Sequence, residues 1–450
     1  MSIGRFFKHL FSSNKNNNSK AKSTSLEQSQ TTGEIAMHYL VLGAGPAGVT
    51  AAETLRKHDK TAKITLLGGE PEPPYSRMAI PYYLIEKVGE EGTYLRQTEG
   101  HYEQLGIDYV HGKATAFLGK AKRLKLEDGS EISFDKLLIA TGARPISPPV
   151  PGLDRPGVHN CWTLEDARNI AKLAKKGEPV VLMGAGFIGS IILESLALKG
   201  VNLTVVEMGD RMVPRMLDET AGTMLQNWCE QKGVRVMTKT MISEVSDGPQ
   251  GLTVKTKDGE NLDAKLLVVA AGVQPNIDFL ASSGVNIDHG ILVDEFMQTN
   301  IQDVYAAGDV CQAKDFSTDK AEMLAIQPVA VEHARIAAQN MAGKLTPHEG
   351  SLNMNVLESM GLITASFGLW MGVEGGDSAR MLDQDNNRYL RLEFKGNKLV
   401  GGQAVGLTEH VGILRGLIQT ECDLGAWKDK LMKSPDRLPE AYVAVAQGVS

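Results

Sequence analysis

The 450-residue chain is predicted to have an α/β fold with two parallel sheets, because one pattern of residues occurs twice along it. In each copy an apolar strand-like segment is followed by a glycine turn and an amphipathic segment: HYLVLGAGPAGVTAAETLRK from residue 38 and PVVLMGAGFIGSIILESLALKG from residue 179. A second pair of segments, KLLIATGARP and LLVVAAGVQPN, also occurs once in each copy. Strands that alternate with helices form parallel sheets with right-handed crossovers.

The second copy is predicted to be inserted into the first. Residues 301–312, IQDVYAAGDVCQ, have the pattern of a returning strand followed by the start of a helix. After about residue 347 the pattern changes to mixed strands and then to a helical stretch from Thr408 onward. We therefore expect a first domain over 35–152 and 276–346, a second over 153–275, and a C-terminal α+β domain over 347–450.

The first 34 residues are predicted to form a basic tail. Residues 14–33 are rich in Asn, Ser, Lys, Thr and Gln, which is typical of a flexible linker. Within residues 1–13, apolar side chains recur at helical spacing beside basic ones, as in a short amphipathic helix. Such a helix contacts a membrane surface or a partner, or the segment is a tail without consequence, and the sequence leaves both open.

Composition excludes several classes of protein. A net charge of -7 and a pI near 5.9 do not fit a nucleic-acid-binding surface. The four cysteines are too scattered for a metal site and too few for a disulfide scaffold, so we predict no metal and a reducing, cytoplasmic setting. The most apolar run, Val180 to Leu193, is too short for a membrane span, and the N-terminus lacks the features of a signal peptide. The sequence leaves open whether the tail contacts the inner face of the membrane.

Each copy places the pattern GxGxxG between its strand and its helix. There the first glycine permits a tight turn, the second lets a pyrophosphate approach the backbone, and the third packs the helix on the strand. Free N–H groups at the helix N-terminus bind phosphate. We therefore predict two Rossmann-like dinucleotide-binding domains, with contacts from Gly43, Ala44, Gly45, Pro46, Ala47 and Gly48 in the first and Gly184, Gly186, Phe187, Ile188 and Gly189 in the second.

An acidic residue about 20 positions after such a turn accepts hydrogen bonds from an adenosine ribose. Glu207 holds this position in the second copy, where a carboxylate favours NAD and repels the 2′-phosphate of NADP, although Arg211 lies nearby. In the first copy the second strand ends in two glycines, so Glu70 is the expected ribose contact, with a solvated turn carboxylate as the alternative.

The ordered motifs resemble one family: GAGPAG at 43–48, PYSR at 74–77, LLIATGARP at 137–145, GAGFIG at 184–189, AAGVQPN at 270–276 and VYAAGDV at 304–310. Over roughly residues 37–430 the chain is similar to the FAD-dependent pyridine-nucleotide oxidoreductases, within them the rubredoxin and ferredoxin reductases and the flavin module of nitrite reductase. The resemblance implies that the first domain binds FAD, the second binds NAD, Asp309 binds the ribityl chain or a phosphate, and Arg77 lies by the pyrophosphate. Further cofactor contacts are expected at Thr141, Gly142, Gly272 and Gly308.

The chain departs from parts of the family that use thiols. Met78 stands where single-cysteine relatives have their cysteine, and the CxxxxC pair of the disulfide reductases is absent. Ile191 stands where relatives often have a Glu that helps to place the nicotinamide, with Glu194 one turn further on. Cys311 is expected to be a small buried residue at a helix start rather than a redox group.

The sequence therefore predicts an FAD-dependent enzyme that passes a hydride from NADH to FAD, without a redox-active disulfide. Its electron acceptor is expected to be a small redox protein such as a rubredoxin or ferredoxin. The alternatives are an NADH oxidase that uses oxygen or a small acceptor, and a non-catalytic NADH/FAD redox sensor. A homodimer is compatible with the resemblance.

Overall fold

The computed structural model describes residues 36–407, 409 and 411–448. The predicted helix at 1–13 and linker at 14–33 lie outside these residues. Contacts between Cα atoms divide the chain into Met1–Ala36 and Met37–Ser450. Within Met37–Ser450, the part that contains the first glycine turn is called the first unit, and the part that contains the second glycine turn is called the second unit. No helix in the described part of the chain is long and apolar enough to cross a membrane.

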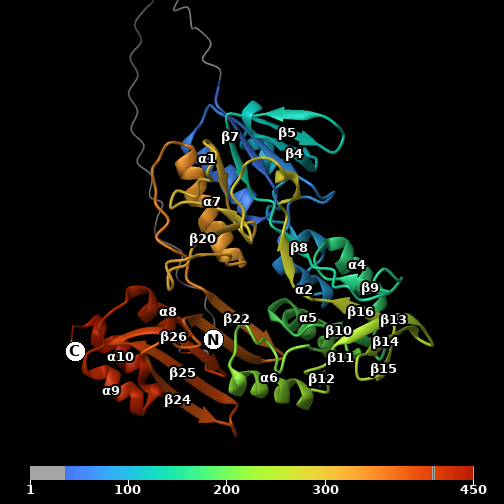
Figure 1. The fold of residues 1–450 in the computed structure, drawn as a ribbon, viewed down its shortest axis with the longest axis vertical. Helices are drawn as coiled ribbons and strands as arrows, with labels where there is room; N and C mark the ends of the chain where they lie inside the picture. The colour runs from blue at the N-terminus through green and yellow to red at the C-terminus, as the bar shows by residue number, and fades with distance from the viewer. Residues whose placement is uncertain (1–35, 408, 410, 449–450) are drawn as a thin grey trace, which may run out of the picture. The chain divides into compact units, whose positions relative to one another are not determined.

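The first sheet is parallel, with the order β19-β7-β1-β2-β3. Its strand β7 is labelled in Figure 1. Its strands are β1 (His38–Leu42), β2 (Lys63–Gly68), β3 (Ile107–His111), β7 (Lys136–Ile139) and β19 (Val304–Ala306). Buried helices α1 (Pro46–His58) and α7 (Gln327–Met341) pack against each other and share a hydrophobic core with the strands. Because β19 pairs with β7, the sheet combines residues from before and after the second copy, as expected.

The second sheet is also parallel, with the order β12-β11-β10-β16-β9. Its strands are β9 (Val158–Asn160), β10 (Pro179–Met183), β11 (Asn202–Val206), β12 (Arg235–Met237) and β16 (Leu266–Val269). The associated helices are α4 (Leu164–Leu173), α5 (Phe187–Leu198) and α6 (Glu219–Gln231). Strands β10 and β16 are buried on both faces, which is why they read as continuous apolar runs.

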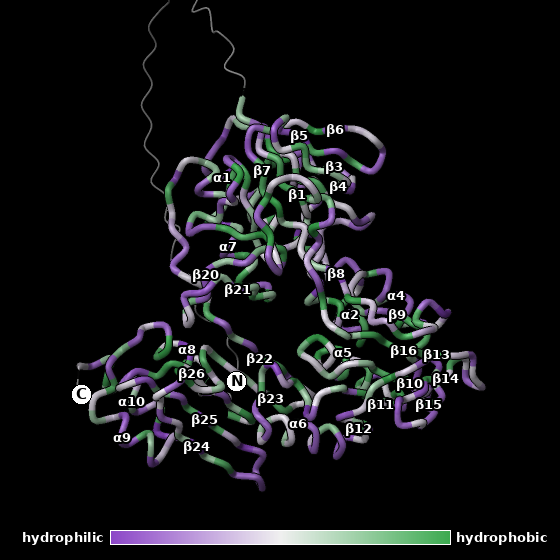
Figure 2. The backbone as a smooth tube through the Cα atoms, viewed as in Figure 1, coloured by the Kyte–Doolittle hydropathy of each residue, from purple (hydrophilic) through white to green (hydrophobic). Residues whose placement is uncertain are grey.

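The C-terminal sheet is antiparallel, with the order β22-β23-β26-β25-β24. It comprises β22 (Met354–Ser359), β23 (Leu362–Gly368), β24 (Asp377–Asp383), β25 (Arg388–Lys395) and β26 (Lys398–Val405). Helices α8 (Val411–Thr420), α9 (Ala426–Lys433) and α10 (Leu438–Ala446) share a core with it, while α5 and α6 of the second unit contact β22 and β23. Figure 2 shows hydrophobic residues along many of the strands and hydrophilic residues in many of the loops.

Smaller elements complete the first two units. Antiparallel sheets are formed by β4 (Ala114–Leu118), β5 (Arg123–Leu126) and β6 (Glu131–Ser133), and by β13 (Ile242–Gly248), β14 (Gly251–Thr256) and β15 (Asn261–Ala264). A ribbon is formed by β8 (Ala143–Pro145) and β17 (Val273–Pro275). Short helices are α2 (Ile80–Leu84) and α3 (His101–Gln104). The α/β fold with two Rossmann-like units and a C-terminal α+β part is confirmed, whereas the domain boundaries stay a prediction.

One local prediction is wrong. A helix was expected to begin after Asp309, but residues Cys311–Lys314 form strand β20, which pairs with β18 (Ile291–Leu292) and β21 (Ala321–Glu322). The backbone turns at Gly308, where φ is +79°, and the chain then pairs with the edge of β18. The side chains of Cys311, Gln312 and Ala313 are buried there. The helix begins later, at Gln327, with Pro328 in its first turn.

Candidate functional site

The glycine turn of the first unit has a separate steric reason for each glycine. At Gly43, where φ is +111°, a Cβ atom would lie 2.1 Å from the carbonyl oxygen of Ala140, and at Gly48 it would lie 1.7 Å from that of Gly43. At Gly45 a Cβ atom would meet nothing within 4 Å. Gly45 is also the N-cap of α1 and provides no side-chain cap, so the first N–H groups of the helix stay available to a ligand. The space beside Gly45 is therefore a cradle for a group that approaches the backbone.

The second unit repeats this arrangement at its own turn. A Cβ atom at Gly184 would lie 2.5 Å from the carbonyl oxygen of Ala270, and one at Gly189 would lie 2.1 Å from that of Gly184. Gly186 has nothing within 4 Å and is the uncapped N-terminus of α5. Phe187 and Ile188 form the first turn of α5 and pack partly buried against the core of this unit.

Distant segments meet the first turn where the sequence predicted cofactor contacts. A Cβ atom at Gly308 would lie 3.4 Å from the Cβ of Ala47 and 3.3 Å from that of Ala330 in α7. At the end of β2, a Cβ atom at Gly68 would lie 3.2 Å from the Cβ of Ala44. Pro46 is the first residue of α1, where its missing N–H costs no hydrogen bond.

Thr141 and Gly142 follow strand β7 and lie beside Asn276, which follows strand β17. Thr141 Oγ1 donates to the carbonyl of Asn276 at 2.8 Å, and Asn276 Nδ2 donates to the carbonyl of Thr141 at 2.9 Å. Both Gly142 and Gly272 have positive φ, +63° and +109°, which favours glycine. These two glycines bracket the β8–β17 ribbon that links the units.

Asp309 is the one acidic residue of the AAGD segment, and its carboxylate receives no hydrogen bond from the residues that the structure describes. Burial raises its pKa to about 6, although the positive charge of Arg77 acts in the opposite direction. A half-buried carboxylate without donors is unfavourable unless a ligand supplies them. Asp309 thus fits a ligand that carries hydroxyl groups.

Glu70 and Arg77 are brought together, and they bind each other. Arg77 Nη2 lies 2.5 Å from Glu70 Oε1, and Tyr75 Oη donates to the same carboxylate. Arg77 Nη1 also donates to the carbonyl of Trp162, and the guanidinium lies over the rings of Tyr75 and Trp162. Sequence reasoning missed Tyr75 and Trp162, although Tyr75 stands within the PYSR motif. Glu70 is therefore tied to Arg77 here, so a ribose contact would require it to exchange partners.

Glu207 is 9 % exposed and is held by two backbone amides. Its Oε2 accepts from Ala185 N at 2.6 Å, and its Oε1 accepts from Gly209 N at 2.6 Å. The carboxylate is thereby fixed next to the second glycine turn. Arg211, which left the choice of nucleotide in doubt, donates to Asp210 and to the carbonyls of Leu217 and Pro214. Its guanidinium is thus already satisfied by protein groups.

Two further features bear on the chemistry. Glu194 accepts from the backbone N–H of Met360 at 3.3 Å, so it faces the C-terminal sheet and does not replace the Glu missing at Ile191. Cys161, Cys229 and Cys311 are buried, and burial raises the pKa of Cys161 and of Cys229 to about 12. Burial also raises the pKa of the Cys311 thiol, so all three are protonated at neutral pH. Cys311 lies in a strand rather than at the expected helix start.

Comparisons with known proteins agree with this geometry. A family model described as pyridine nucleotide-disulphide oxidoreductase matches residues 37–339. The NADH-dependent phenylglyoxylate dehydrogenase subunit epsilon of Aromatoleum evansii is 31% identical over 88% of this chain and 95% of its own length. Rhodocoxin reductase of Rhodococcus erythropolis is 34% identical over 69% of this chain and 73% of its own. An NAD-dependent persulfide reductase structure from A. fulgidus superposes with a TM-score of 0.80 and 27% identity, over 87% of this chain and 78% of that one.

Proposed function

The chain belongs to the pyridine nucleotide-disulphide oxidoreductase family, and from that premise we propose that it is an FAD-dependent enzyme that oxidises NADH and delivers the electrons to a second acceptor. The observation that carries the proposal is the pair of glycine turns, each with an open, uncapped helix N-terminus at its middle glycine. The earlier identification of the family from its motifs is confirmed.

FAD is assigned to the first unit. The pyrophosphate would lie beside Gly45 and bind the N–H groups that begin α1, where the helix dipole favours negative charge. The Asp309 carboxylate would accept hydrogen bonds from the ribityl hydroxyls, which supplies the donors that it lacks among the described residues. Gly308 allows that part of the ligand to pass close to α1 and α7. Arg77 acts in this assignment mainly as the partner of Glu70 and of the Trp162 carbonyl.

NADH is assigned to the second unit. Its pyrophosphate would lie beside Gly186, and the Glu207 carboxylate would face the two hydroxyls of the adenosine ribose. A 2′-phosphate at that place would meet the same negative charge. Because Arg211 is engaged by backbone carbonyls and Asp210, it offers no free cation for such a phosphate. This arrangement supports a preference for NADH over NADPH.

The bound flavin supplies the redox chemistry, since it accepts a hydride from a nicotinamide and can release electrons singly. The protein contributes orientation and electrostatics more than acid or base groups. The described residues place no cysteine at the PYSR segment, and the buried thiols are protonated at neutral pH. These thiols would therefore not relay electrons between a bound flavin and the acceptor.

A one-electron redox protein is the proposed acceptor. The names of two relatives support this: one is a rhodocoxin reductase, and the other is subunit epsilon of an NADH-dependent phenylglyoxylate dehydrogenase. The alternatives are oxygen or a small acceptor, and a sensor that holds its electrons. Oxygen consumption with NADH alone would identify an oxidase, and a long-lived reduced flavin without turnover on any acceptor would identify a sensor.

The central experiment is a titration of the purified chain with NADH under anaerobic conditions. We expect a yellow protein with about one FAD per chain, whose flavin absorbance is bleached by one equivalent of NADH and restored by ferricyanide. A folded, colourless protein that takes up no added FAD would overturn the proposal. A flavin that NADH does not bleach would overturn the assignment of the second unit alone.

The cellular setting belongs to the proposal as well. We expect a cytoplasmic protein in which residues 1–13 contact a membrane surface or a partner, and a homodimer is compatible with the family. Deletion of residues 1–33 should leave FAD content and NADH turnover unchanged and weaken binding to anionic vesicles. If vesicle and partner binding are unchanged, the tail has no role in attachment.

A further inference from the structure

The loop of residues 207–217 connects β11 to α6 and carries Glu207, the proposed ribose contact. The loop contacts Ala185 of the glycine turn at two places, its first residue and its middle. Glu207 Oε2 accepts from Ala185 N at 2.6 Å, and Val213 N donates to the carbonyl of the same alanine at 2.9 Å. The backbone of Glu207 is also held by the end of β12, since its N–H donates to the carbonyl of Met237 at 2.8 Å. The loop therefore shares with this strand the placement of the carboxylate relative to Gly186.

The conformation of this loop is imposed by its surroundings. Val213 has a φ of +47°, a region that is unfavourable for a β-branched residue and persists only when neighbouring contacts determine it. Val213 and Leu217 are buried, and Arg211 donates from Nε to the carbonyl of Leu217 at 3.0 Å. These contacts join the middle of the loop, at Arg211 and Val213, to its end at Leu217, next to Asp218.

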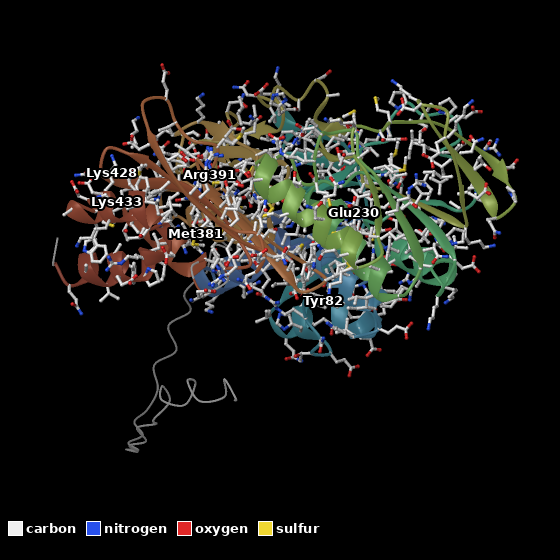
Figure 3. The ribbon with its side chains drawn as sticks, turned by 90° about the horizontal axis from the view of Figure 1, so that it is seen from below. Tyr82, Glu230, Met381, Arg391, Lys428 and Lys433 are labelled. Atoms are coloured by element: carbon white, nitrogen blue, oxygen red, sulfur yellow. The ribbon has the colours of Figure 1, made fainter. Side chains whose placement is uncertain are left out.

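The far end is held by the C-terminal sheet. Asp218, the N-cap of α6, accepts from Ala221 N at 2.9 Å through Oδ1, which leaves Oδ2 for Tyr389 Oη at 2.7 Å and Arg391 Nη1 at 3.1 Å. The backbone N–H of Asp218 donates to Gln403 Oε1 at 2.9 Å. Figure 3 shows Arg391 on this sheet, next to α6.

These contacts are sheltered from water. The side chains of Arg391 and Asp218 are 12% and 14% exposed, and Tyr389 and Gln403 are fully buried. Burial would raise the pKa of Asp218, but the hydrogen bonds from Ala221, Tyr389 and Arg391 outweigh it and lower the pKa. Asp218 is thus a carboxylate across the neutral range, and it keeps both partners there. Charge-assisted hydrogen bonds of this kind are among the stronger ones in proteins.

We propose that Tyr389 and Arg391 of the C-terminal sheet are positioning residues for the nucleotide, because through Asp218 they fix the loop that presents Glu207 to the adenosine ribose. The inference rests on the proposed NADH site. On this inference the C-terminal part affects the affinity for NADH through Asp218. The C-terminal part itself contributes no residue to the second glycine turn.

The test measures binding of ADP-ribose by calorimetry to FAD-loaded Tyr389→Phe and Asp218→Asn variants of the full chain. Phe removes only the hydroxyl, and Asn keeps an N-cap while it removes one of the two carboxylates that pair with Arg391, the other being Glu393. We expect the Kd to rise about threefold in the first variant and about tenfold in the second. The KM for NADH should rise with it, while kcat and FAD content stay unchanged.

Trp228→Phe is the matched control. It removes a hydrogen bond of 3.1 Å from Nε1 to the carbonyl of Ser359 across the same contact between α6 and the C-terminal sheet, but far from the loop. We expect it to leave the Kd unchanged. An equal loss of affinity in Trp228→Phe, or no loss in either test variant, would overturn the inference.

Glu207→Ala separates this inference from the assignment of the site. If it does not weaken ADP-ribose binding, the proposed NADH site is wrong, and the positioning role falls with it. If it weakens binding while both loop variants bind as the natural chain does, the site stands and only the positioning role is wrong.

Discussion

The two dinucleotide-binding units share one turn and differ in how they hold the acidic residue that follows it. In both, the first and third glycines are required by backbone contacts and the middle glycine faces open space. In the second unit Glu207 is fixed by the backbone amides of Ala185 and Gly209, next to the turn. In the first unit Glu70 is paired with Arg77 and Tyr75. The backbone geometry of the glycine turn is thus reproduced between the units, whereas the partners of the acidic residue that follows the turn differ.

The sharpest test of the comparison is the same substitution in both turns. Gly45→Val and Gly186→Val each add a side chain where a Cβ meets nothing, in an extended backbone that valine tolerates, so both variants should fold. Because the added methyl groups fill the space proposed for a pyrophosphate, Gly45→Val should lose nearly all FAD. Gly186→Val should keep its FAD and lose reduction by NADH. Bound flavin is measured by absorbance after gel filtration, and flavin bleaching by stopped flow.

Gly412→Ala is the control for that pair, since a Cβ at Gly412 also meets open space but lies on the C-terminal helix α8. It should retain both properties. Exchanged phenotypes, with Gly45→Val losing only NADH reduction, would reverse the assignment of the two units.

Glu207→Ala is expected to have the next largest effect. The second unit then loses the carboxylate that is proposed to contact the ribose diol and to repel a 2′-phosphate. The ratio of kcat/KM for NADH to that for NADPH should fall by about ten- to a hundredfold, which corresponds to roughly 1–3 kcal/mol. Steady-state kinetics with both nucleotides measure it. A natural chain that already uses NADPH as well as NADH would contradict the role given to Glu207.

Asp309 is expected to make the binding of FAD by the first unit depend on pH. Its pKa of about 6 in the free protein means that protons compete with FAD, because the carboxylate form is the acceptor for ribityl hydroxyls. Affinity for FAD should be complete above pH 7 and decline as the pH falls through 6, by about fourfold at pH 5.5. Fluorescence titration of apoprotein with FAD measures this, and Asp309→Asn should bind more weakly with no decline over that range.

The smallest effect is expected for the thiols. Substitution of Cys161, Cys229, Cys311 and Cys422 by Ser or Ala, singly and together, should keep NADH-to-ferricyanide turnover within a few-fold in every variant that folds, because the buried thiols are protonated. A thiol relay would need a thiolate within reach of the flavin and a resolving sulfur. Slow reoxidation of the flavin in a folded, FAD-loaded Cys311 variant would show that a thiol takes part.

Much of this architecture could be predicted from sequence because it is encoded locally. Strand, turn and helix are contiguous in each unit, so the steric need for Gly43 and Gly48 is visible in the spacing. The strand at Cys311 could not be foreseen, because it depends on the edge of β18, which lies about twenty residues earlier. The pairing of Arg77 with Trp162, and of Asp218 with Tyr389, joins residues far apart in the chain. Nothing in the spacing of either pair indicates that they meet.

The β19–β7 pairing has a consequence for how the protein is made. Strand β7 ends at Ile139, but its neighbour β19 begins only at Val304, so the first sheet has an unpaired edge while the whole second unit is being synthesised. Asp309 and Gly308 follow β19 directly and arrive later still. The nascent chain can thus complete the strands of the second unit before those of the first. On the proposed assignment of FAD to the first unit, we expect flavin to be captured late in translation, and truncated chains that end before residue 304 to have an open sheet edge and to retain no FAD.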